Sequence, residues 1–260
     1  MEPAPHPPEP ARPLGRVWLV ANRASRSTDE GRIAALEAAL QAAGATIAGS
    51  SNFPLESAPD AAALAGIDTL VVMGGDGTLG AASSAASAWD GQFLAIPGGT
   101  MNLLPKALHG DASLEAIVAV AGQGVLAHVP VVRAAGHTSY CRIIIGPLTR
   151  WALARGFLGG VKVAGQPGRN PGVLVIPGDQ GLEVALFSGR GLADAMAVAV
   201  NWLLNDWRAA ASVTAFTAPE LVVGRRRTVR CLFDGELRRL PPSVRFVPGW
   251  SDLRYIRTLA

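Results

Sequence analysis

The first half of the chain alternates short apolar runs with segments whose apolar residues recur every three or four positions. Residues 16–23 and 67–73 are apolar runs that stop at polar or glycine-rich stretches, which is typical of buried strands. Between them, residues 29–44 repeat apolar side chains at helical spacing and end at a glycine, which predicts a helix. Residues 92–99 and 111–124 repeat this order of strand and helix. The alternation predicts a Rossmann-like α/β domain, with a parallel sheet and helices on both faces.

The second half differs, because its apolar runs are short and are bounded by glycine and proline. Such runs are typical of antiparallel sheets, and they predict a β-rich, sandwich-like C-terminal domain. One helical pattern, at residues 192–209, interrupts them. The predicted parts are a disordered, proline-rich lead-in at residues 1–14, an α/β domain at 15–127, a β-rich domain at 128–245, and a closing segment at 246–260 that we expect to return to the first domain.

The composition favours a folded chain without a membrane span. Of the 260 residues, 49% are hydrophobic and 17% are charged, so a sizeable core can form. No apolar run is as long as a transmembrane helix, and the first residues lack the basic start and apolar stretch of a signal peptide. Cys141 and Cys231 lie in apolar, strand-like runs, which favours reduced core residues. Together these features predict a cytoplasmic protein.

Positive charge gathers near the C-terminus. The formal net charge is +3, and GRRRTVR at residues 224–230 is followed by five further arginines. One interpretation is a solvated strand face. The other is a patch for an anionic membrane surface or a phosphorylated ligand, which predicts peripheral contact with the inner membrane face. The preference for arginine over lysine is a habit of composition, so we expect no nucleic-acid partner.

The sequence GGDGT, at residues 74–78, follows one of the predicted parallel strands. Loops at the carboxyl ends of parallel strands bind ligands in open α/β sheets. Glycines let backbone N–H groups approach an anion, and the start of the next helix adds a favourable dipole. A bare carboxylate would repel phosphate, so Asp76 indicates a metal–phosphate complex or a hydrogen bond to a ribose or to backbone. A tight turn that needs glycine is the structural alternative.

A second loop repeats this layout. Residues 94–106, LAIPGGTMNLLPK, place two glycines, Thr100 and Asn102 directly after an apolar strand. Alone, PGGT indicates a turn. Two neighbouring strand ends that each carry Gly-Thr form a two-sided cradle, which favours a phosphate-bearing ligand.

Three motifs in this order resemble the catalytic domain of the diacylglycerol kinase family, the lipid kinases that include bacterial diacylglycerol kinases and sphingosine kinases. GGDGT is followed about twenty residues later by P-x-G-T-x-N, and FDGE at residues 233–236 is similar to the family's DGE strand. VANRASRS at residues 20–27 stands where the family has an Asn-Pro-x-x-Gly phosphate loop. The resemblance covers residues 16–256. It implies a nucleotide-binding domain like that of NAD kinases and diacylglycerol kinases, a β-rich substrate domain, ATP and Mg²⁺ as cofactors, and a lipid acceptor.

The resemblance also implies a role for each matching residue. Glu236 would be the general base on the lipid hydroxyl, and Asp234 would support it. Phosphoryl transfer needs positioning and charge neutralisation more than covalent help, which fits these residue types. For FDGE alone, the alternative is a hairpin turn, since Asp-Gly is a favoured turn sequence. The residues implied in binding the ATP phosphates are Asn22, Gly74, Gly75, Asp76, Gly77, Thr78, Gly99, Thr100 and Asn102.

Some positions depart from the family pattern. The family follows GGDGT with Asn-Glu, where this chain has Gly80 and Ala81. The family's DDGLLDV stretch corresponds to GDQGLEV at residues 178–184, so the metal-linked aspartate falls at Gln180 or, shifted by one residue, at Asp179. We take Asp179 as the candidate metal ligand. These changes indicate a divergent subgroup with another acceptor, or reduced activity.

Three functions follow from these motifs. The first is an ATP-dependent lipid kinase that phosphorylates a hydroxyl of a diacylglycerol-like lipid. The second is a NAD kinase-like small-molecule kinase, which shares GGDGT but does not explain PGGTMN or the late DGE. The third is a regulatory protein that binds nucleotide and has lost turnover. The sequence predicts neither the acceptor lipid nor the oligomeric state.

Overall fold

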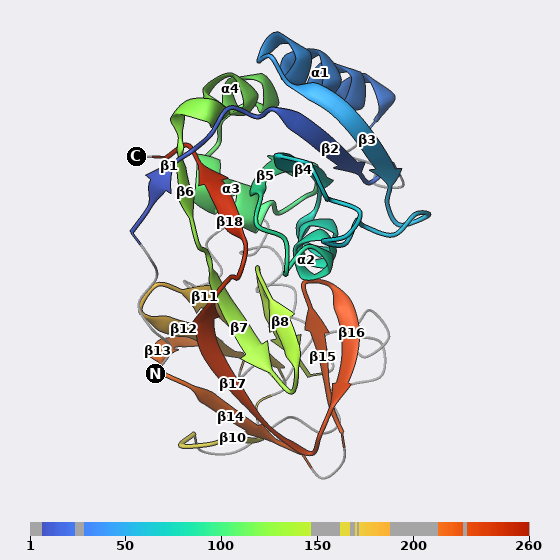
Figure 1. Ribbon diagram of the computed structural model, residues 1–260. Helices are drawn as coiled ribbons and strands as arrows, with labels where there is room; N and C mark the ends of the chain where they lie inside the picture. The colour runs from blue at the N-terminus through green and yellow to red at the C-terminus, as the bar shows by residue number, and fades with distance from the viewer. Residues whose placement is uncertain are drawn as a thin grey trace. The chain divides into compact units, whose positions relative to one another are not determined.

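The computed structural model describes residues 7–23, 29–146, 162–166, 170, 172–187, 213–225 and 228–259. The chain divides into two compact units (Figure 1). The first consists of Met1–Val129 with Trp250–Ala260, and the second is Pro130–Gly249. The chain therefore leaves the first unit and re-enters it at the end.

The first unit is built on a mixed seven-stranded sheet with the strand order β1-β6-β18-β5-β4-β2-β3. Neighbours from β18 to β3 run parallel, whereas β6 is antiparallel to β18, and β1 to β6. The apolar run of β4 is buried at every position, as expected for a strand covered on both faces. The strands are β1 (Glu9–Pro10), β2 (Arg16–Ala21), β3 (Thr46–Asn52), β4 (Thr69–Gly74), β5 (Gln92–Pro97), β6 (Val125–Ala127) and β18 (Arg254–Arg257).

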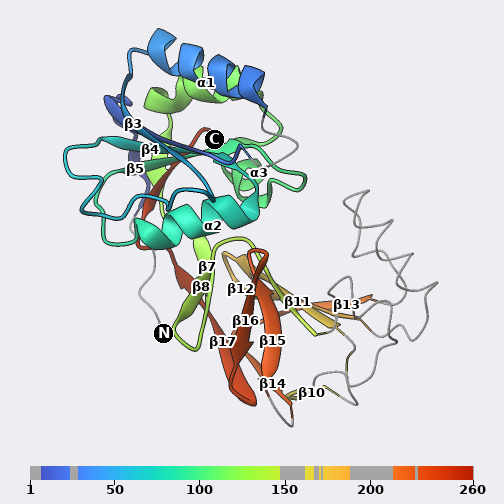
Figure 2. The ribbon, with the colours of Figure 1, turned by 90° about the vertical axis from the view of Figure 1, so that its right-hand side faces the viewer.

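Helices cover both faces of this sheet. Figure 2 shows α1 and α2 on opposite sides of the strands. α1 begins after Asp29, whose carboxylate accepts a hydrogen bond from the N–H of Arg32, and it shares one apolar core with α4 and the sheet. On the other face, the Tyr255 hydroxyl of β18 donates to Ser83 of α2 at 2.7 Å. The helices are α1 (Glu30–Ala42), α2 (Asp76–Ala85), α3 (Leu103–His109) and α4 (Leu114–Val120), followed by the 3₁₀ turn η1 (Ala121–Gln123).

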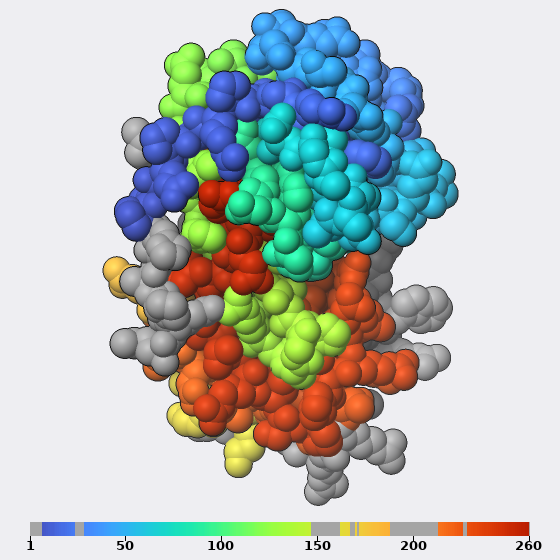
Figure 3. Space-filling view, viewed as in Figure 1, coloured from blue at the N-terminus to red at the C-terminus, as the bar shows by residue number. Residues whose placement is uncertain are grey.

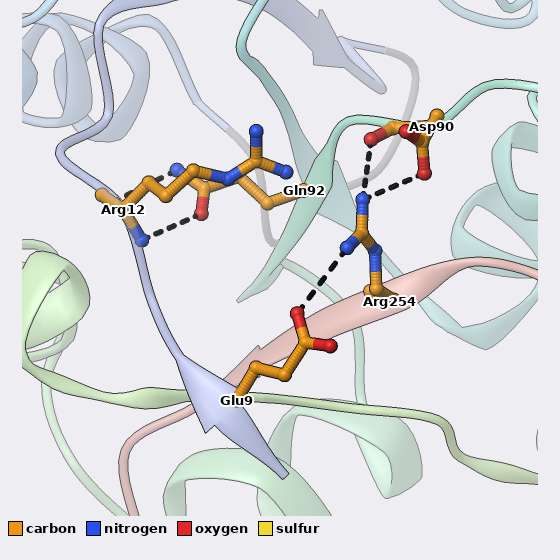
Figure 4. Close-up of polar contacts among 5 residues, drawn as sticks. All are labelled: Glu9, Arg12, Asp90, Gln92 and Arg254. Carbon is orange, nitrogen blue, oxygen red and sulfur yellow. Dashed lines mark hydrogen bonds and ion pairs between the residues drawn. The ribbon is translucent and has the colours of Figure 1, made fainter. Parts of the chain in front are cut away.

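Residues 7–14 do not form the disordered lead-in that their composition predicted. Strand β1 pairs with β6, and Figure 3 shows the N-terminal segment in dark blue along the first unit. The side chain of Gln92 accepts a hydrogen bond from the N–H of Arg12 at 3.1 Å and donates to its carbonyl at 3.0 Å. Proline is tolerated because β1 is an edge strand, where a ladder N–H can be missing. Figure 4 shows the polar contacts of this region, among Glu9, Arg12, Asp90, Gln92 and Arg254.

The second unit contains two sheets of antiparallel strands. Their orders are β10-β14-β17-β7-β8 and β13-β12-β11-β9-β15-β16. Both sheets contribute to one apolar core, for example through Val132 of β7, Val175 of β11 and Phe246 of β17. The strands are β7 (Pro130–Ala134), β8 (His137–Ser139), β9 (Ile143–Ile145), β10 (Lys162–Val163), β11 (Gly172–Gly178), β12 (Gly181–Phe187), β13 (Val213–Ala218), β14 (Leu221–Gly224), β15 (Val229–Phe233), β16 (Glu236–Leu240) and β17 (Ser243–Trp250).

The predicted fold class is confirmed, since an α/β unit with a largely parallel sheet is joined to a β-rich unit. The helix predicted at residues 192–209 lies outside the described residues. Among the helices that are described, none combines the length and the apolar character needed to cross a membrane.

Candidate functional site

Two neighbouring parallel strands of the first unit end side by side. Gly74 at the end of β4 is paired with Pro97 at the end of β5, and the N–H of Gly98 donates to the carbonyl of Gly74 at 3.0 Å. The loops GGDGT and PGGTMN therefore leave the same edge of the sheet. The last three residues of GGDGT already form the first turn of α2, which begins at Asp76, and α3 begins at Leu103, directly after PGGTMN.

The two loops approach each other so closely that glycine is required. A Cβ atom on Gly99 would lie 2.5 Å from the Cα of Gly75, and one on Gly74 would lie 2.6 Å from the Cβ of Thr78. Neither Gly74 nor Gly99 has a positive φ. Contact with the backbone of the other loop therefore explains Gly99, and the side chain of Thr78 within the same motif explains Gly74; turn geometry explains neither.

Side chains tie the three predicted loops together. The amide of Asn22, in the first loop, donates to the hydroxyl of Thr78 at 3.0 Å. The N–H of Leu103, at the start of α3, donates to the carboxylate of Asp76 at 2.9 Å. The second loop is thereby joined to the GGDGT loop, and the GGDGT loop to the end of β2.

Asn102 holds the second loop in shape. Its side chain accepts a hydrogen bond from the N–H of Gly99 at 2.8 Å and donates to the carbonyl of Gly99 at 2.9 Å. Its backbone is left-handed, with a φ of 51°, a conformation that asparagine tolerates well. At this edge the structure brings together Asn22, Gly74, Gly75, Asp76, Gly77, Thr78, Gly99, Thr100 and Asn102.

This arrangement suits an anionic ligand. Gly75, the N-cap of α2, has no side chain to cap the first turn, and a helix N-terminus attracts negative charge. Asp76 is buried, and its carboxylate accepts a backbone hydrogen bond. A backbone hydrogen bond is one of the explanations that the sequence allowed for an aspartate beside a phosphate site.

Arg32 lies beside this edge and has no motif signal in the sequence. One of its guanidinium N–H groups donates to the carbonyl of Pro97 at 2.8 Å, directly before the second glycine loop. The pKa of Glu115 on α4 is lowered chiefly by hydrogen bonds to its own backbone and to Ser113, and Arg32 adds a smaller lowering. The guanidinium thus fixes the start of α1 to the end of β5.

The second unit carries Asp234 and Glu236 in the β15–β16 hairpin. Asp234 and Gly235 have φ values of 49° and 97°. Two successive positive φ angles are required in a type I′ hairpin turn, for which Asp-Gly is favoured. The hairpin turn that we gave as the structural alternative for FDGE is therefore present, and its geometry alone explains Gly235.

The carboxylate of Asp234 is buried and fully engaged within the protein. It accepts hydrogen bonds from the Ser139 hydroxyl at 2.7 Å and from three successive backbone N–H groups at 2.8–2.9 Å, those of Tyr140, Cys141 and Arg142. Burial raises the pKa of Asp234, and these hydrogen bonds oppose that shift. Asp234 therefore joins the hairpin turn to the segment between β8 and β9.

Glu236 differs from Asp234 because its carboxylate is accessible. Its side chain is 47% exposed, and it forms an ion pair with Arg238 two residues further along β16. Of the two acidic residues in the hairpin, Glu236 alone can present a carboxylate oxygen to a bound molecule.

Asp179 lies at the exposed tip of the β11–β12 hairpin. Within the described part of the chain, no three His, Cys, Asp or Glu residues gather where they could hold a metal ion. The assignment of Asp179 as a metal ligand stays a prediction.

Comparison with known proteins agrees with the motifs. Residues 16–134 match the family model of the diacylglycerol kinase catalytic domain, which confirms the resemblance over that range and indicates a kinase. The chain matches no curated protein.

Solved structures show the same fold at low sequence identity. A diacylglycerol kinase from Bacillus anthracis str. Sterne superposes with a TM-score of 0.64 at 14% identity, over 94% of this chain and 97% of that chain. A NAD kinase from Archaeoglobus fulgidus in complex with ATP superposes with a TM-score of 0.54 at 14% identity, over 93% of each chain.

Proposed function

We propose that the protein is an ATP-dependent kinase that transfers the γ-phosphate to a hydroxyl of a diacylglycerol-like lipid. The observation that carries this proposal is the joining of three loops at one sheet edge, within a segment that matches a kinase catalytic domain. Glycine-rich loops at the carboxyl ends of parallel strands are suited to bind a nucleotide's phosphates.

ATP binds at this edge through its phosphates. The N-terminus of α2 and the backbone of both glycine loops supply N–H groups, and the Asn22–Thr78 hydrogen bond keeps the Thr78 hydroxyl in place. The ATP-bound NAD kinase with the same fold supports this assignment. Mg²⁺ would neutralise phosphate charge when it accompanies ATP.

Glu236 acts as the general base. It accepts the proton of the lipid hydroxyl while that oxygen bonds to the γ-phosphorus and the bond between the γ-phosphorus and the bridging oxygen breaks, releasing ADP. A carboxylate in this role contributes about two to four orders of magnitude in rate. Asp234 positions the turn that carries Glu236 and takes no proton, because its oxygens are engaged by Ser139 and the following backbone.

A lipid acceptor places the protein at the inner face of a membrane, in peripheral contact and without insertion. The family match supports a lipid, since the matched domain is that of diacylglycerol kinases. A NAD kinase-like activity is the second candidate, because a NAD kinase shares the fold. The third is a regulatory protein without turnover, suggested by Gly80 and Ala81 after the first glycine loop.

The acceptor decides among these candidates. Wild-type protein is given ATP labelled in the γ-phosphate with Mg²⁺, and NAD or mixed micelles of diacylglycerol, ceramide, sphingosine, monoacylglycerol or undecaprenol. We expect label in a lipid. Label in NAD alone would establish the second candidate, and ATP binding without any labelled product would establish the third.

A further inference from the structure

The outer face of the β15–β16 hairpin carries an unusual group of side chains, Arg230, Leu232, Leu237 and Arg239, which we call the hairpin patch. Alternate residues of β15, namely Val229, Cys231 and Phe233, belong to the apolar core. Because successive side chains of a strand point to opposite faces, Arg230 and Leu232 face outward. Figure 2 shows this hairpin in orange in the second unit.

Two arginines stand directly opposite each other in this patch. Arg230 is paired with Arg239 in the antiparallel ladder, and both are exposed. Directly paired residues have Cβ atoms about 5 Å apart, so like charges there are destabilising. In the described part of the chain, neither guanidinium has an ion-pair partner. The repulsion between the two guanidinium groups therefore destabilises the hairpin, and a bound anion would relieve it.

The next pair on the same face of the hairpin is apolar. Leu232 is paired with Leu237, and Leu237 is 53% exposed. The same row continues through Ile144 to Leu174, which is buried. An exposed leucine therefore lies beside two arginines that have no ion-pair partner among the described residues, and together they form a surface that is both cationic and apolar.

We infer that the hairpin patch docks on the surface of an anionic lipid bilayer. Arginines that face acidic headgroups gain electrostatic attraction, and leucines gain by leaving water for the interfacial region. A nucleic acid would complement the arginines but not Leu232 and Leu237, so the leucines favour a lipid surface. The inference deepens the proposed function, since a kinase acting on a membrane lipid must reach that membrane, but vesicle binding is measured without any transfer reaction.

The test is sedimentation of the full-length protein with vesicles. The vesicles contain equal parts of phosphatidylglycerol and phosphatidylcholine, or phosphatidylcholine alone. We expect binding to the anionic vesicles only, weakened by salt. The double variant Arg230→Gln/Arg239→Gln should bind about twenty-five-fold more weakly, since each basic residue near an anionic surface contributes about fivefold. Leu237→Gln should also weaken binding.

Arg245→Gln is the matched control, because Arg245 is an exposed arginine on β17 that already has Glu220 as a partner at 3.2 Å. It should bind vesicles like the wild type, apart from the small effect of one charge. Equal binding by the double variant and the wild type would overturn the inference. Equal binding of the wild type to neutral and anionic vesicles would also overturn it. So would binding of an RNA oligonucleotide to the hairpin patch that does not depend on Leu237.

Arg239→Glu separates docking from folding. It places opposite charges at the Arg230–Arg239 pair, so the melting temperature should stay level or rise while vesicle binding falls. A fall in both would indicate a structural role for Arg239 and would contradict the inference. If vesicles bind as expected but no lipid is phosphorylated, the docking surface stands and the proposed kinase function fails.

Discussion

At the scale of single residues, two buried polar side chains make long-range hydrogen bonds that sequence patterns do not reveal. Asp234 gathers four hydrogen bonds from one short segment, and His109 of α3 bonds to Thr258 beside the closing strand. Both are almost fully buried. Neither position has an apolar-periodic or motif signal for this role, because their partners lie about 90 and 150 residues away in the chain.

Removing the Asp234 carboxylate should destabilise the second unit. Asp234→Ala leaves the Ser139 hydroxyl and three backbone N–H groups without their acceptor, and each buried unsatisfied group costs about 1–3 kcal/mol. We expect a loss of at least about 3 kcal/mol in the free energy of unfolding by urea, with a smaller loss for Asp234→Asn, which keeps one acceptor oxygen. A loss below about 1 kcal/mol for Asp234→Ala would contradict this role.

His109 should make stability depend on pH. Burial lowers its pKa from 6.5 to about 4, partly opposed by the backbone of Ala95. The folded state therefore favours neutral His109, and its contribution is present above pH 6.5 and is lost as the pH falls towards 4. The total loss is about 3 kcal/mol, since one pKa unit corresponds to about 1.4 kcal/mol.

The matched variant is His109→Asn, which keeps a polar group near Thr258 and cannot titrate. The free energy of unfolding by urea, measured between pH 7 and pH 4, should fall less with acid in this variant than in the wild type. Identical declines for His109→Asn and wild type would show that other groups govern acid unfolding.

At the scale of elements, the candidate site is a contact between two loops, and sequence predicts part of it. Repeated Gly-Thr after two apolar strands sufficed to expect the loops at one edge of a sheet, and the confirmed fold class places them there. The pattern could not reveal why Gly99 must be glycine, because the atom it would strike belongs to Gly75 in the other loop. It also missed Arg32, whose partner is a backbone carbonyl and leaves no trace in sequence.

Gly99→Ala tests this contact. The added Cβ would lie 2.5 Å from the Cα of Gly75, so the loops must separate. Overpacking of this kind costs about 1–3 kcal/mol, and we expect ATP affinity measured by calorimetry to fall about tenfold or more. Gly224→Ala is the control, since a Cβ there meets no atom within 4 Å. Unchanged ATP affinity in Gly99→Ala would mean that ATP does not use this loop contact.

At the scale of the whole molecule, the chain closes its first sheet with its last strand. β18 lies between β6 and β5, and Tyr255 and Ile256 are completely buried. The proline-rich stretch does not predict that β1 pairs at the edge of this sheet. The partner strand β6 and Gln92, which bonds to Arg12, lie far along the chain from this stretch. Alternating strands and helices, by contrast, are local patterns, which is why the fold class was predictable.

A chain truncated after Gly249 should lose the structure of the first unit. Removing β18 separates β5 from β6 and exposes the apolar surface that Tyr255 and Ile256 cover. We expect weak near-UV circular dichroism and strong binding of a hydrophobic dye, with ATP binding abolished. Native-like spectra and ATP binding in the truncated chain would show that β18 is dispensable for this sheet.

The most direct test of the proposed kinase is a single-turnover measurement with wild type and Glu236→Gln. Each protein is loaded with ATP labelled in the γ-phosphate, and the lipid acceptor is then added in micelles. We predict equal ATP affinity, and a rate of lipid labelling at least about a hundredfold lower in Glu236→Gln, because the variant lacks the general base. Equal labelling rates in the two proteins would contradict the assignment of Glu236, and an absence of labelled lipid in the wild type would contradict the lipid kinase itself.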